Sequence, residues 1–402
     1  MRRELHQAFR VEYEFPVVFT RGAFARDNPV LADAFRRAGA QPHRVLLVLD
    51  AGVSDADPDL VARVNAYAAA HADVLTFVAP PLIVPGGESC KNDVSAVGHI
   101  HALVERHGLC RHSFVLALGG GAVLDVAGYA TATAHRGLRL VRMPSTVLAQ
   151  NDVGVGVKNG LNLFGRKNFV GTFTPPFAVV NDLDLLRTLP PRDLRSGMAE
   201  AVKVAAIKDA EFLTWLHHEQ RRLAAFTPEA IEHLIVRCAE LHLEHIRAGD
   251  PFENGTARPL DFGHWSAHRL EALTAGALRH GEAVAIGIAL DGLYAHARGL
   301  LSDVELERLH GTLLGLGFEL AHPILGWLDV EGALAQFREH IGGELCLTLP
   351  QGLGHRIDVY DIDVALMQRC IAELIRRFAK GRHHEEPDVS DVGAGSPRRR
   401  VP

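Results

Sequence analysis

The sequence predicts an α/β amino-terminal domain followed by an all-helical carboxyl-terminal domain. Over roughly the first 185 residues, continuous apolar segments of strand length alternate with helical patterns, which is typical of a parallel sheet covered on both faces. From about Leu189 the apolar residues recur with helical spacing instead,. A chain of 402 residues is long enough for two domains,. We expect an α/β domain at residues 1–187, a helical domain at 188–380 and a disordered, aperiodic tail at 381–402,.

The expected strands of the sheet are the apolar segments at residues 44–50, 74–78, 113–118, 138–143 and 178–181. Helices are expected at 58–70 and 91–107, with Asp57 as the cap of the first and Pro58 at its first position,. Residues 9–19 alternate more loosely and are expected to add an antiparallel strand. Helical spacing in the second domain predicts helices at 200–207, 229–246, 267–273, 281–298, 304–314 and 364–378,. The cleft between the domains is the expected site.

Composition narrows the class of protein. A net charge of −6 and a pI of about 6.4 argue against a large nucleic-acid interface,. The five cysteines are scattered and form no Cys-x-x-Cys pair, as expected in a reducing compartment. The sequence has no run of about 18 apolar residues and no signal-peptide pattern at its start,. We therefore expect a cytoplasmic, globular enzyme with no membrane span.

Gly119, Gly120 and Gly121 lie between a predicted strand and a predicted helix. Glycine at such a junction lets a pyrophosphate approach the amides of the helix N-terminus, because no Cβ intervenes. The triplet is not a Gly-x-Gly-x-x-Gly fingerprint, and a tight turn is the alternative interpretation. Asp50 ends an earlier strand, where an acid can bind an adenosine ribose or simply cap a turn,. Together these residues predict a dinucleotide site.

Glu200, His264 and His280 are candidate metal ligands of the helical domain. Zinc accepts nitrogen and oxygen ligands and keeps one position open in catalytic sites. His268 shares a helix face with His264, because the two are four residues apart,, so both cannot be assumed to be ligands. A hydrogen-bonded structural histidine is the alternative at each position. That alternative is weakened by three candidates in helices around one expected cleft.

Lys158, Lys167, Asn168 and Lys203 are polar residues in apolar, glycine-rich surroundings. Such a group suits the oxygens of phosphate and sugar. The alternatives are a solvated charged surface and, for Lys203, a helix pair with Glu200 three residues earlier,. One dinucleotide, one metal and a lysine-rich pocket indicate redox chemistry on a phosphorylated, hydroxylated substrate.

A set of motifs follows in one order through more than half of the chain. They are Pro85-Gly-Gly-Glu-x-x-Lys91, Gly119-Gly-Gly-x-x-x-Asp125, Arg136-Gly, Pro144-Ser-Thr146, Leu148-Ala-Gln-x-Asp152, Lys158, Gly165-x-Lys167-Asn168, Gly197-x-Ala-Glu200-x-x-Lys203, Phe262-Gly-His264-x-x-x-His268 and His280-Gly-Glu282. In this order they resemble the sugar phosphate cyclase family, whose best known member is 3-dehydroquinate synthase.

The resemblance implies a dinucleotide-binding first domain, NAD, one divalent metal and a homodimer. Glu200, His264 and His280 would hold the metal, with zinc expected and cobalt as the alternative. The residues lining NAD would be Asp50, Glu88, Lys91, Gly120, Gly121, Asp125, Ser145, Thr146, Thr188 and Leu189. The residues contacting the sugar chain or phosphate would be Asp152, Lys158, Lys167, Asn168 and Lys203, with His268 as a proton-transfer or binding residue. Arg136 would reach the phosphate bound by the neighbouring subunit.

The implied reaction uses NAD as a recycled catalyst. A hydride leaves a secondary alcohol of the substrate, phosphate is eliminated, and the hydride returns to the substrate. An intramolecular aldol step then closes the carbocycle. The protein would mainly position and polarise the reacting groups.

The chain departs from 3-dehydroquinate synthase where that enzyme binds the carboxylate end of its substrate. The family has an Asn three residues before the first metal His, where this chain has Asp261. The family's Arg falls on Ala257, with Arg258 displaced by one residue. The family's helix Lys falls on Leu243, beside His242. Gaining an acid and losing cations should disfavour a carboxylate, because an unpaired charge is costly in a desolvated pocket. We therefore expect a neutral-headed sugar phosphate, such as a heptulose 7-phosphate or a hexose 6-phosphate.

Three alternatives remain open. An authentic 3-dehydroquinate synthase would need Arg258 and His242 to bind the carboxylate. An alcohol or glycerol dehydrogenase of the iron-dependent type would share the fold, although a glutamate in the metal set argues against it. A degenerate binding protein is disfavoured by the near-complete metal and NAD sets.

Overall fold

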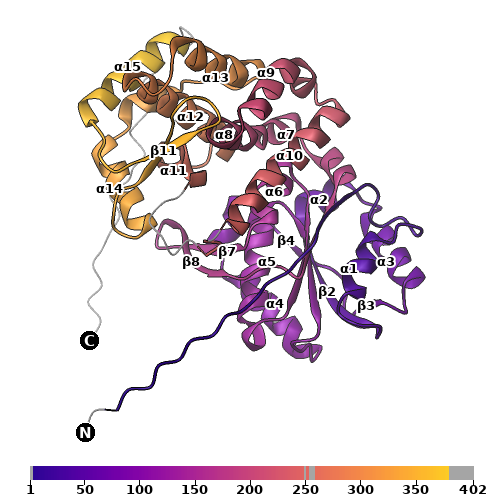
Figure 1. The fold of residues 1–402 in the computed structure, drawn as a ribbon. Helices are drawn as coiled ribbons and strands as arrows, with labels where there is room; N and C mark the ends of the chain where they lie inside the picture. The colour runs from indigo at the N-terminus through magenta and orange to yellow at the C-terminus, as the bar shows by residue number, and fades with distance from the viewer. Residues whose placement is uncertain (1–2, 249, 253–258, 380–402) are drawn as a thin grey trace, which may run out of the picture.

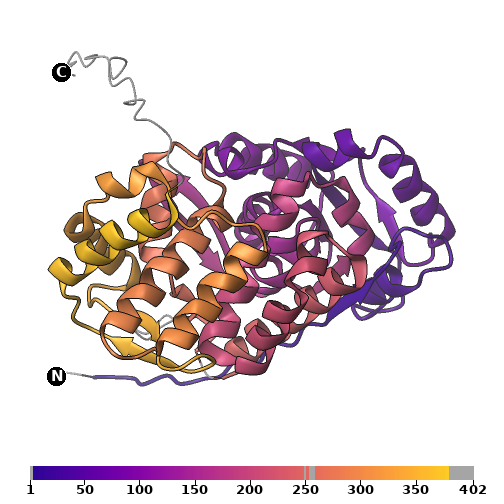
Figure 2. The ribbon, with the colours of Figure 1, turned by 90° about the horizontal axis from the view of Figure 1, so that it is seen from above.

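The computed structural model describes residues 3–248, 250–252 and 259–379, and the expected tail at 381–402 lies outside them. A sheet with helices on both faces forms the amino-terminal half, and a group of helices forms the carboxyl-terminal half beside it (Figures 1 and 2). This arrangement confirms the predicted fold class.

The amino-terminal sheet has seven strands in the order β1-β9-β6-β5-β2-β3, with β4 also paired to β2, and every pair is parallel. The strands are β1 (Val17–Thr20), β2 (His43–Asp50), β3 (Leu75–Phe77), β4 (Leu82–Val84), β5 (Phe114–Gly119), β6 (Arg139–Pro144) and β9 (Ala178–Asp182). Its helices are α1 (Val30–Arg36), α2 (Ala51–Ala56), α3 (Leu60–Ala70), α4 (Ser95–Arg106), α5 (Gly121–Thr133) and α6 (Val147–Asn151). Short 3₁₀ helices are η1 (Glu88–Asn92), η2 (Ala134–Arg136), η3 (Val153–Val155) and η4 (Leu183–Thr188).

The interior strand β2 shows why the sheet is covered on both faces. Val45, Leu47 and Leu49 belong to the core that includes residues of α1 and α3, whereas Leu46 and Val48 belong to the core that includes residues of α4 and α5. Successive side chains of a strand point to opposite faces, so a strand buried on both sides must be apolar throughout. The continuous apolar segments of the sequence therefore became interior parallel strands.

Two local predictions in this half were wrong. The first strand is not antiparallel: β1 pairs in parallel with β9, Val17 opposite Val179. A crossover through α1 separates β1 from β2, so both strands run in the same direction. The helix expected from Pro58 begins at Leu60, because Asp57 closes the unforeseen helix α2 with its amide bonded to the carbonyl of Val53.

A two-stranded antiparallel hairpin, which the sequence did not predict, follows η3. Its strands are β7 (Lys158–Leu163) and β8 (Arg166–Phe173). The hairpin packs on α5, where a Cβ added to Gly128 would lie 1.7 Å from Oδ1 of Asn159. In Figure 1 the hairpin extends from the sheet domain toward the helices of the other half. It therefore places residues of the first domain near the second.

The carboxyl-terminal half is built around one buried helix. Its helices are α7 (Pro191–Ser196), α8 (Met198–Lys208), α9 (Ala210–Ala224), α10 (Pro228–Arg247), α11 (His264–Leu273), α12 (His280–Ala297), α13 (Asp303–Gly315), α14 (Val330–Ile341) and α15 (Val364–Phe378), with η5 (Pro259–Asp261) and η6 (Pro323–Trp327). Helix α12 is buried along nearly its whole length, and a helix that is apolar all round belongs in a core. The half is not entirely helical, because β10 (Leu347–Pro350) and β11 (Arg356–Val359) form an antiparallel pair.

No helix in the described part of the chain combines the length and apolar character needed to cross a bilayer.

Candidate active site

Three helices of the carboxyl-terminal half bring Glu200, His264 and His280 together. Glu200 lies in the first turn of α8, and the two histidines are the first residues of α11 and α12. Their ligand atoms all lie within 4.8 Å of one another. Oε1 of Glu200 is 3.6 Å from Nε2 of His264 and 3.2 Å from Nε2 of His280. The three predicted metal ligands thus converge on one point.

The hydrogen bonds of the two rings fit metal binding. Nδ1 of His264 lies 3.2 Å from the carbonyl oxygen of Phe262, and Nδ1 of His280 lies 3.0 Å from Oε1 of Glu271. Each ring is therefore held through Nδ1, which directs Nε2 toward Glu200. Metal-binding histidines are commonly held in this way. One carboxylate and two imidazoles are a donor set that suits zinc or cobalt, so these residues fit a divalent ion.

The charges around the trio favour a cation there. Burial by itself lowers the pKa of His280, yet Glu271 and Glu200 raise that pKa to about 10. Burial raises the pKa of Glu200, but Lys203 and His264 hold it well below its usual range. Glu200 therefore stays ionised, and the surrounding carboxylates stabilise positive charge at the ring of His280, whether as a proton or as a metal ion.

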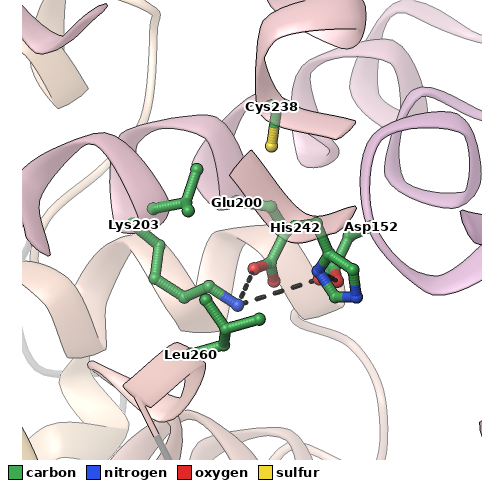
Figure 3. Close-up of a pocket in the computed structure, with 7 residues that line it drawn as sticks. Asp152, Glu200, Lys203, Cys238, His242 and Leu260 are labelled. Atoms are coloured by element: carbon green, nitrogen blue, oxygen red, sulfur yellow. Dashed lines mark ion pairs between the residues drawn. The ribbon is translucent and has the colours of Figure 1, made fainter. Parts of the chain in front are cut away.

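Lys203 lies at the centre of a second, adjoining group of charges. Its Nζ contacts Glu200 and is 3.7 Å from Oδ2 of Asp152 (Figure 3). Oδ1 of Asp152 lies 2.9 Å from Nδ1 of His242. Burial lowers the pKa of Lys203, but Glu200, Asp152 and Asp261 together raise it above its usual value. The small pocket here is lined by Asp152, Glu200, Lys203, Val204, Cys238, His242 and Leu260 (Figure 3).

His242 is a site residue whose position the sequence left unsettled. Comparison with the family pattern pointed to Leu243, but in the structure Leu243 packs against the small apolar cluster of Val155, Val179 and Ala239. The side chain that α10 directs into the pocket is His242. Its four-residue spacing from Cys238, another pocket residue, is the signal that could have identified it,.

Glu271 is a site residue that sequence reasoning missed. It lies on α11, and its carboxylate contacts both Nδ1 of His280, at 3.0 Å, and Nζ of Lys167, at 2.6 Å. Its side chain is buried. The seven-residue spacing from His264 puts both side chains on one face of α11, which is the signal that was available.

Several of the residues predicted to line NAD meet at the carboxyl ends of β2, β5 and β6, which are neighbours in the sheet. The carboxylate of Asp50 accepts hydrogen bonds from the amides of Gly52, at 2.9 Å, and Gly120, at 3.2 Å. A Cβ added to Gly120 would lie 3.3 Å from Cγ2 of Thr146. Asp50 therefore caps α2, as the alternative interpretation held, and also faces the glycine turn. Gly121 begins α5, and Ser145 precedes Thr146, the cap of α6.

The other predicted NAD residues lie nearby. Nζ of Lys91 is 2.6 Å from Oδ2 of Asp125 and also contacts Oδ1 of Asn168. Glu88 accepts a hydrogen bond of 2.8 Å from Asn162 on β7. These contacts join η1 to the hairpin. Thr188 and Leu189 follow at the end of η4, which packs against α2.

The structure brings some of the predicted substrate residues to the metal trio and leaves Lys158 at the surface. Lys167 and Asn168 on β8 and His268 on α11 lie at the site, with the ring of His268 5.5 Å from that of His264. Lys158 begins β7 and is exposed. Burial, together with His264 and His280, lowers the pKa of His268 well below its usual value.

Arg136 is not brought to this site. It follows α5 on η2, at the end opposite the glycine turn, and a helix of 13 residues spans about 20 Å,. It lines a separate surface hollow with Cys110, Arg111, Thr133 and His135.

Comparisons with known proteins agree with this architecture. Residues 81–196 match the family model described as 3-dehydroquinate synthase N-terminal, and residues 197–339 match the one described as 3-dehydroquinate synthase C-terminal. The 3-dehydroquinate synthase of Xanthomonas oryzae pv. oryzae is 39% identical over 300 residues, which covers 72% of this chain and 80% of that protein.

Two solved structures are similar over most of the chain. ValA, a 2-epi-5-epi-valiolone synthase from Streptomyces hygroscopicus subsp. jinggangensis 5008 with NAD+ and Zn2+ bound, has a TM-score of 0.83 at 31% identity and covers 93% of this chain and 100% of its own. A 2-deoxy-scyllo-inosose synthase in complex with carbaglucose-6-phosphate, NAD+ and Co2+ shares the fold, with a TM-score of 0.73 at 23% identity over 89% and 96% of the two chains. Since the two family models cover more than half of the residues, this chain belongs to the 3-dehydroquinate synthase family, and sugar phosphate cyclases are among its structural neighbours.

Proposed function

We propose that this protein is an NAD- and divalent-metal-dependent sugar phosphate cyclase that eliminates phosphate, closes a carbocycle and prefers a substrate whose far end is neutral. The observation that carries the proposal is the charge around Lys203. Its Nζ contacts the carboxylate of Glu200 and lies 3.7 Å from Oδ2 of Asp152, and the carboxylate of Asp261 also acts on it. The three carboxylates and the ammonium of Lys203 together carry a net negative charge that a divalent ion at Glu200 would neutralise. No net positive charge would then remain to attract a substrate carboxylate.

The size of the effect is enough to decide between substrates. Two like charges about 4 Å apart repel by about 4 kcal/mol at an effective dielectric constant of about 20. A substrate carboxylate beside Asp261 would meet that repulsion. A sugar hydroxyl could instead donate a hydrogen bond to Asp261, and a charged acceptor strengthens such a bond. The expected preference is therefore for a polyol end.

Glu200, His264 and His280 would hold the metal, and the residues at the ends of β2, β5 and β6 would hold NAD. Support comes from their convergence in this chain and from ValA, which carries NAD+ and Zn2+. When bound, these groups would supply hydride transfer and Lewis-acid polarisation of a substrate oxygen. Lys203 and Asp152, buried beside the metal position, would orient the hydroxyl groups of the substrate.

Lys167 and His268 would serve the phosphate end. Lys167 supplies a half-buried ammonium at the edge of the site, and His268 lies next to both metal-binding rings. A cation and an imidazole at this place would bind the phosphate, and the imidazole could move the proton that its departure requires.

The competing function is an authentic 3-dehydroquinate synthase. It is favoured by the relatives of that name at 39% identity. Arg258, which could restore carboxylate binding, lies outside the described residues. ValA, a cyclase with a different product in its name, is also similar over 93% of this chain, so overall similarity does not decide the substrate.

The deciding experiment is a comparison of kcat/KM for phosphate release. The substrates are sedoheptulose 7-phosphate, glucose 6-phosphate and 3-deoxy-arabino-heptulosonate 7-phosphate. We expect a neutral substrate to be preferred, and a clear preference for the acid would restore the competing function. Asp261→Asn should shift the ratio toward the acid. Asp303→Asn removes the same charge at an exposed position and should leave the ratio unchanged.

The fate of the nucleotide separates a cyclase from a dehydrogenase. In a cyclase the hydride returns to the substrate within the turnover, so phosphate should be released without steady accumulation of NADH. Stoichiometric NADH build-up at its absorbance band would instead support a dehydrogenase.

We also propose a homodimer in which Arg136 completes the phosphate site of the partner subunit. Support comes from its place far from its own site and from the match of Arg136-Gly to the family pattern. An arginine suits phosphate because its donors form a planar fork. We expect Arg136→Ala and Lys158→Ala each to be inactive, and mixing the two variants should restore some activity through hybrid dimers. Proven subunit exchange without any rescue would count against a shared site.

A further inference from the structure

Glu271 joins the candidate metal centre to the β7–β8 hairpin. Only 8% of its side chain is exposed. Oε1 lies 3.0 Å from Nδ1 of His280 on α12, and Oε2 lies 2.6 Å from Nζ of Lys167 on β8. The two oxygens of one carboxylate therefore bind one element from each half of the molecule.

We propose that Glu271 is a positioning residue of this site, which orients His280 for metal binding and, through Lys167, holds the hairpin beside the metal centre. The inference rests on the proposed function for the existence of that metal. It assigns no ligand role to Glu271 itself.

The contact between Nδ1 of His280 and Glu271 determines which ring nitrogen can bind a metal. Neutral imidazole binds a metal through the nitrogen that carries no proton. When Nδ1 donates to Glu271, the lone pair is on Nε2, which lies 3.2 Å from Oε1 of Glu200. Outer carboxylates of this kind fix the tautomer of a ligand and raise its basicity. Since α11 carries both His264 and Glu271, one rigid helix supplies a metal ligand and the partner of another.

The β7–β8 hairpin is held by contacts of Lys167 and Asn168. Besides Glu271, Nζ of Lys167 has Glu88 at 4.0 Å, and the next residue, Asn168, contacts Lys91. The hairpin is thus tied to η1 on one side and to α11 on the other. Loss of the Lys167–Glu271 pair would remove the tie to α11 and leave the tie to η1. The same carboxylate therefore determines where Lys167 can meet an anionic group of the substrate.

The test uses the metal-free full-length chain titrated with Co2+, whose visible spectrum reports ligand geometry. Glu271→Gln keeps the side-chain shape and removes the charge, and we expect its Co2+ affinity to fall by about 10- to 100-fold with an altered spectrum. Glu271→Asp, which keeps the charge, should recover part of the affinity. Lys167→Met removes the contacts of Nζ with Glu271 and Glu88 but leaves the Glu271–His280 contact in place, so it should keep Co2+ affinity and raise KM for the phosphorylated substrate.

A matched control lies on the same helix as His280. Glu282 is also in the first turn of α12, but its carboxylate pairs with Arg192. Glu282→Gln should leave the Co2+ affinity and spectrum unchanged. Wild-type affinity and spectrum in Glu271→Gln, with only a lower Tm, would reduce Glu271 to a structural role and overturn the inference alone. Failure of the wild type to bind Co2+ would overturn the metal centre and this inference together.

Discussion

Arg142 offers a sharp test of how the sheet positions the site, because it binds the segment that joins Asp152 to Lys158. It lies on β6 and is fully buried. Its guanidinium donates to the carbonyl oxygens of Gly154 at 3.2 Å, Gly156 at 2.8 Å and Lys158 at 2.9 Å. It also donates a hydrogen bond of 2.7 Å to Oδ1 of Asn159. Arg142→Met should release this whole segment.

The expected cost can be worked from these contacts. Four hydrogen bonds at about 1 kcal/mol each give about 4 kcal/mol, and buried carbonyls left without donors add to that figure. Burial lowers the pKa of Arg142 to about 10, against the effect of Asp125, so relief of desolvation offsets part of the loss. At about 2.1 cal/mol/K per residue the unfolding entropy of the chain is about 0.8 kcal/mol/K, so Tm should fall by about 5 °C.

The assay is thermal unfolding followed by circular dichroism, with kcat measured well below Tm. Arg142→Lys keeps the charge but loses the fork of donors, so it should fall between wild type and Arg142→Met. We also expect kcat to fall in both variants, because Asp152 and Lys158 lose their fixed positions. A Tm for Arg142→Met within about 1 °C of wild type would show that the carbonyls find other donors and would refute this reasoning.

Two further predictions concern the helical half. Gly281 follows His280, and a Cβ at this position would lie 1.8 Å from the backbone oxygen of Ser196. Gly281→Ala should therefore abolish metal binding or folding. Metal content would show the first loss and circular dichroism the second. Asp209 caps α9 and pairs with Arg237 at 2.7 Å. Burial raises the pKa of Asp209, but the cap hydrogen bond and Arg237 outweigh burial and lower that pKa below its ordinary value of 3.8. Ionised Asp209 therefore stabilises the folded protein above about pH 4, and this contribution is lost as the pH falls. At pH 7, Asp209→Asn should lower the free energy of unfolding measured by urea denaturation by about 1 kcal/mol. On acidification the variant should lose less stability than the wild type.

The sequence alone determined the features that depend on local periodicity. Strands buried on both faces must be continuously apolar, so the parallel sheet was readable from segments such as residues 44–50,. Helical spacing predicted α15 with the bounds that the structure shows, Val364–Phe378. The candidate metal ligands could also be predicted from the sequence, because Glu200, His264 and His280 belong to motifs of fixed spacing.

Only the tertiary structure decided the features that depend on contacts between distant segments. The β7–β8 hairpin is polar and glycine-rich and packs on α5, so it shows no simple period, and the direction of β1 follows from a crossover rather than from its residues. His242 became a site residue because α10 turns it, and not Leu243, toward Asp152. Glu271 joins His280 and Lys167, which is 104 residues away in sequence. Spacing along a chain reports which side chains share a face, but it does not report which faces meet, because that depends on how whole elements pack.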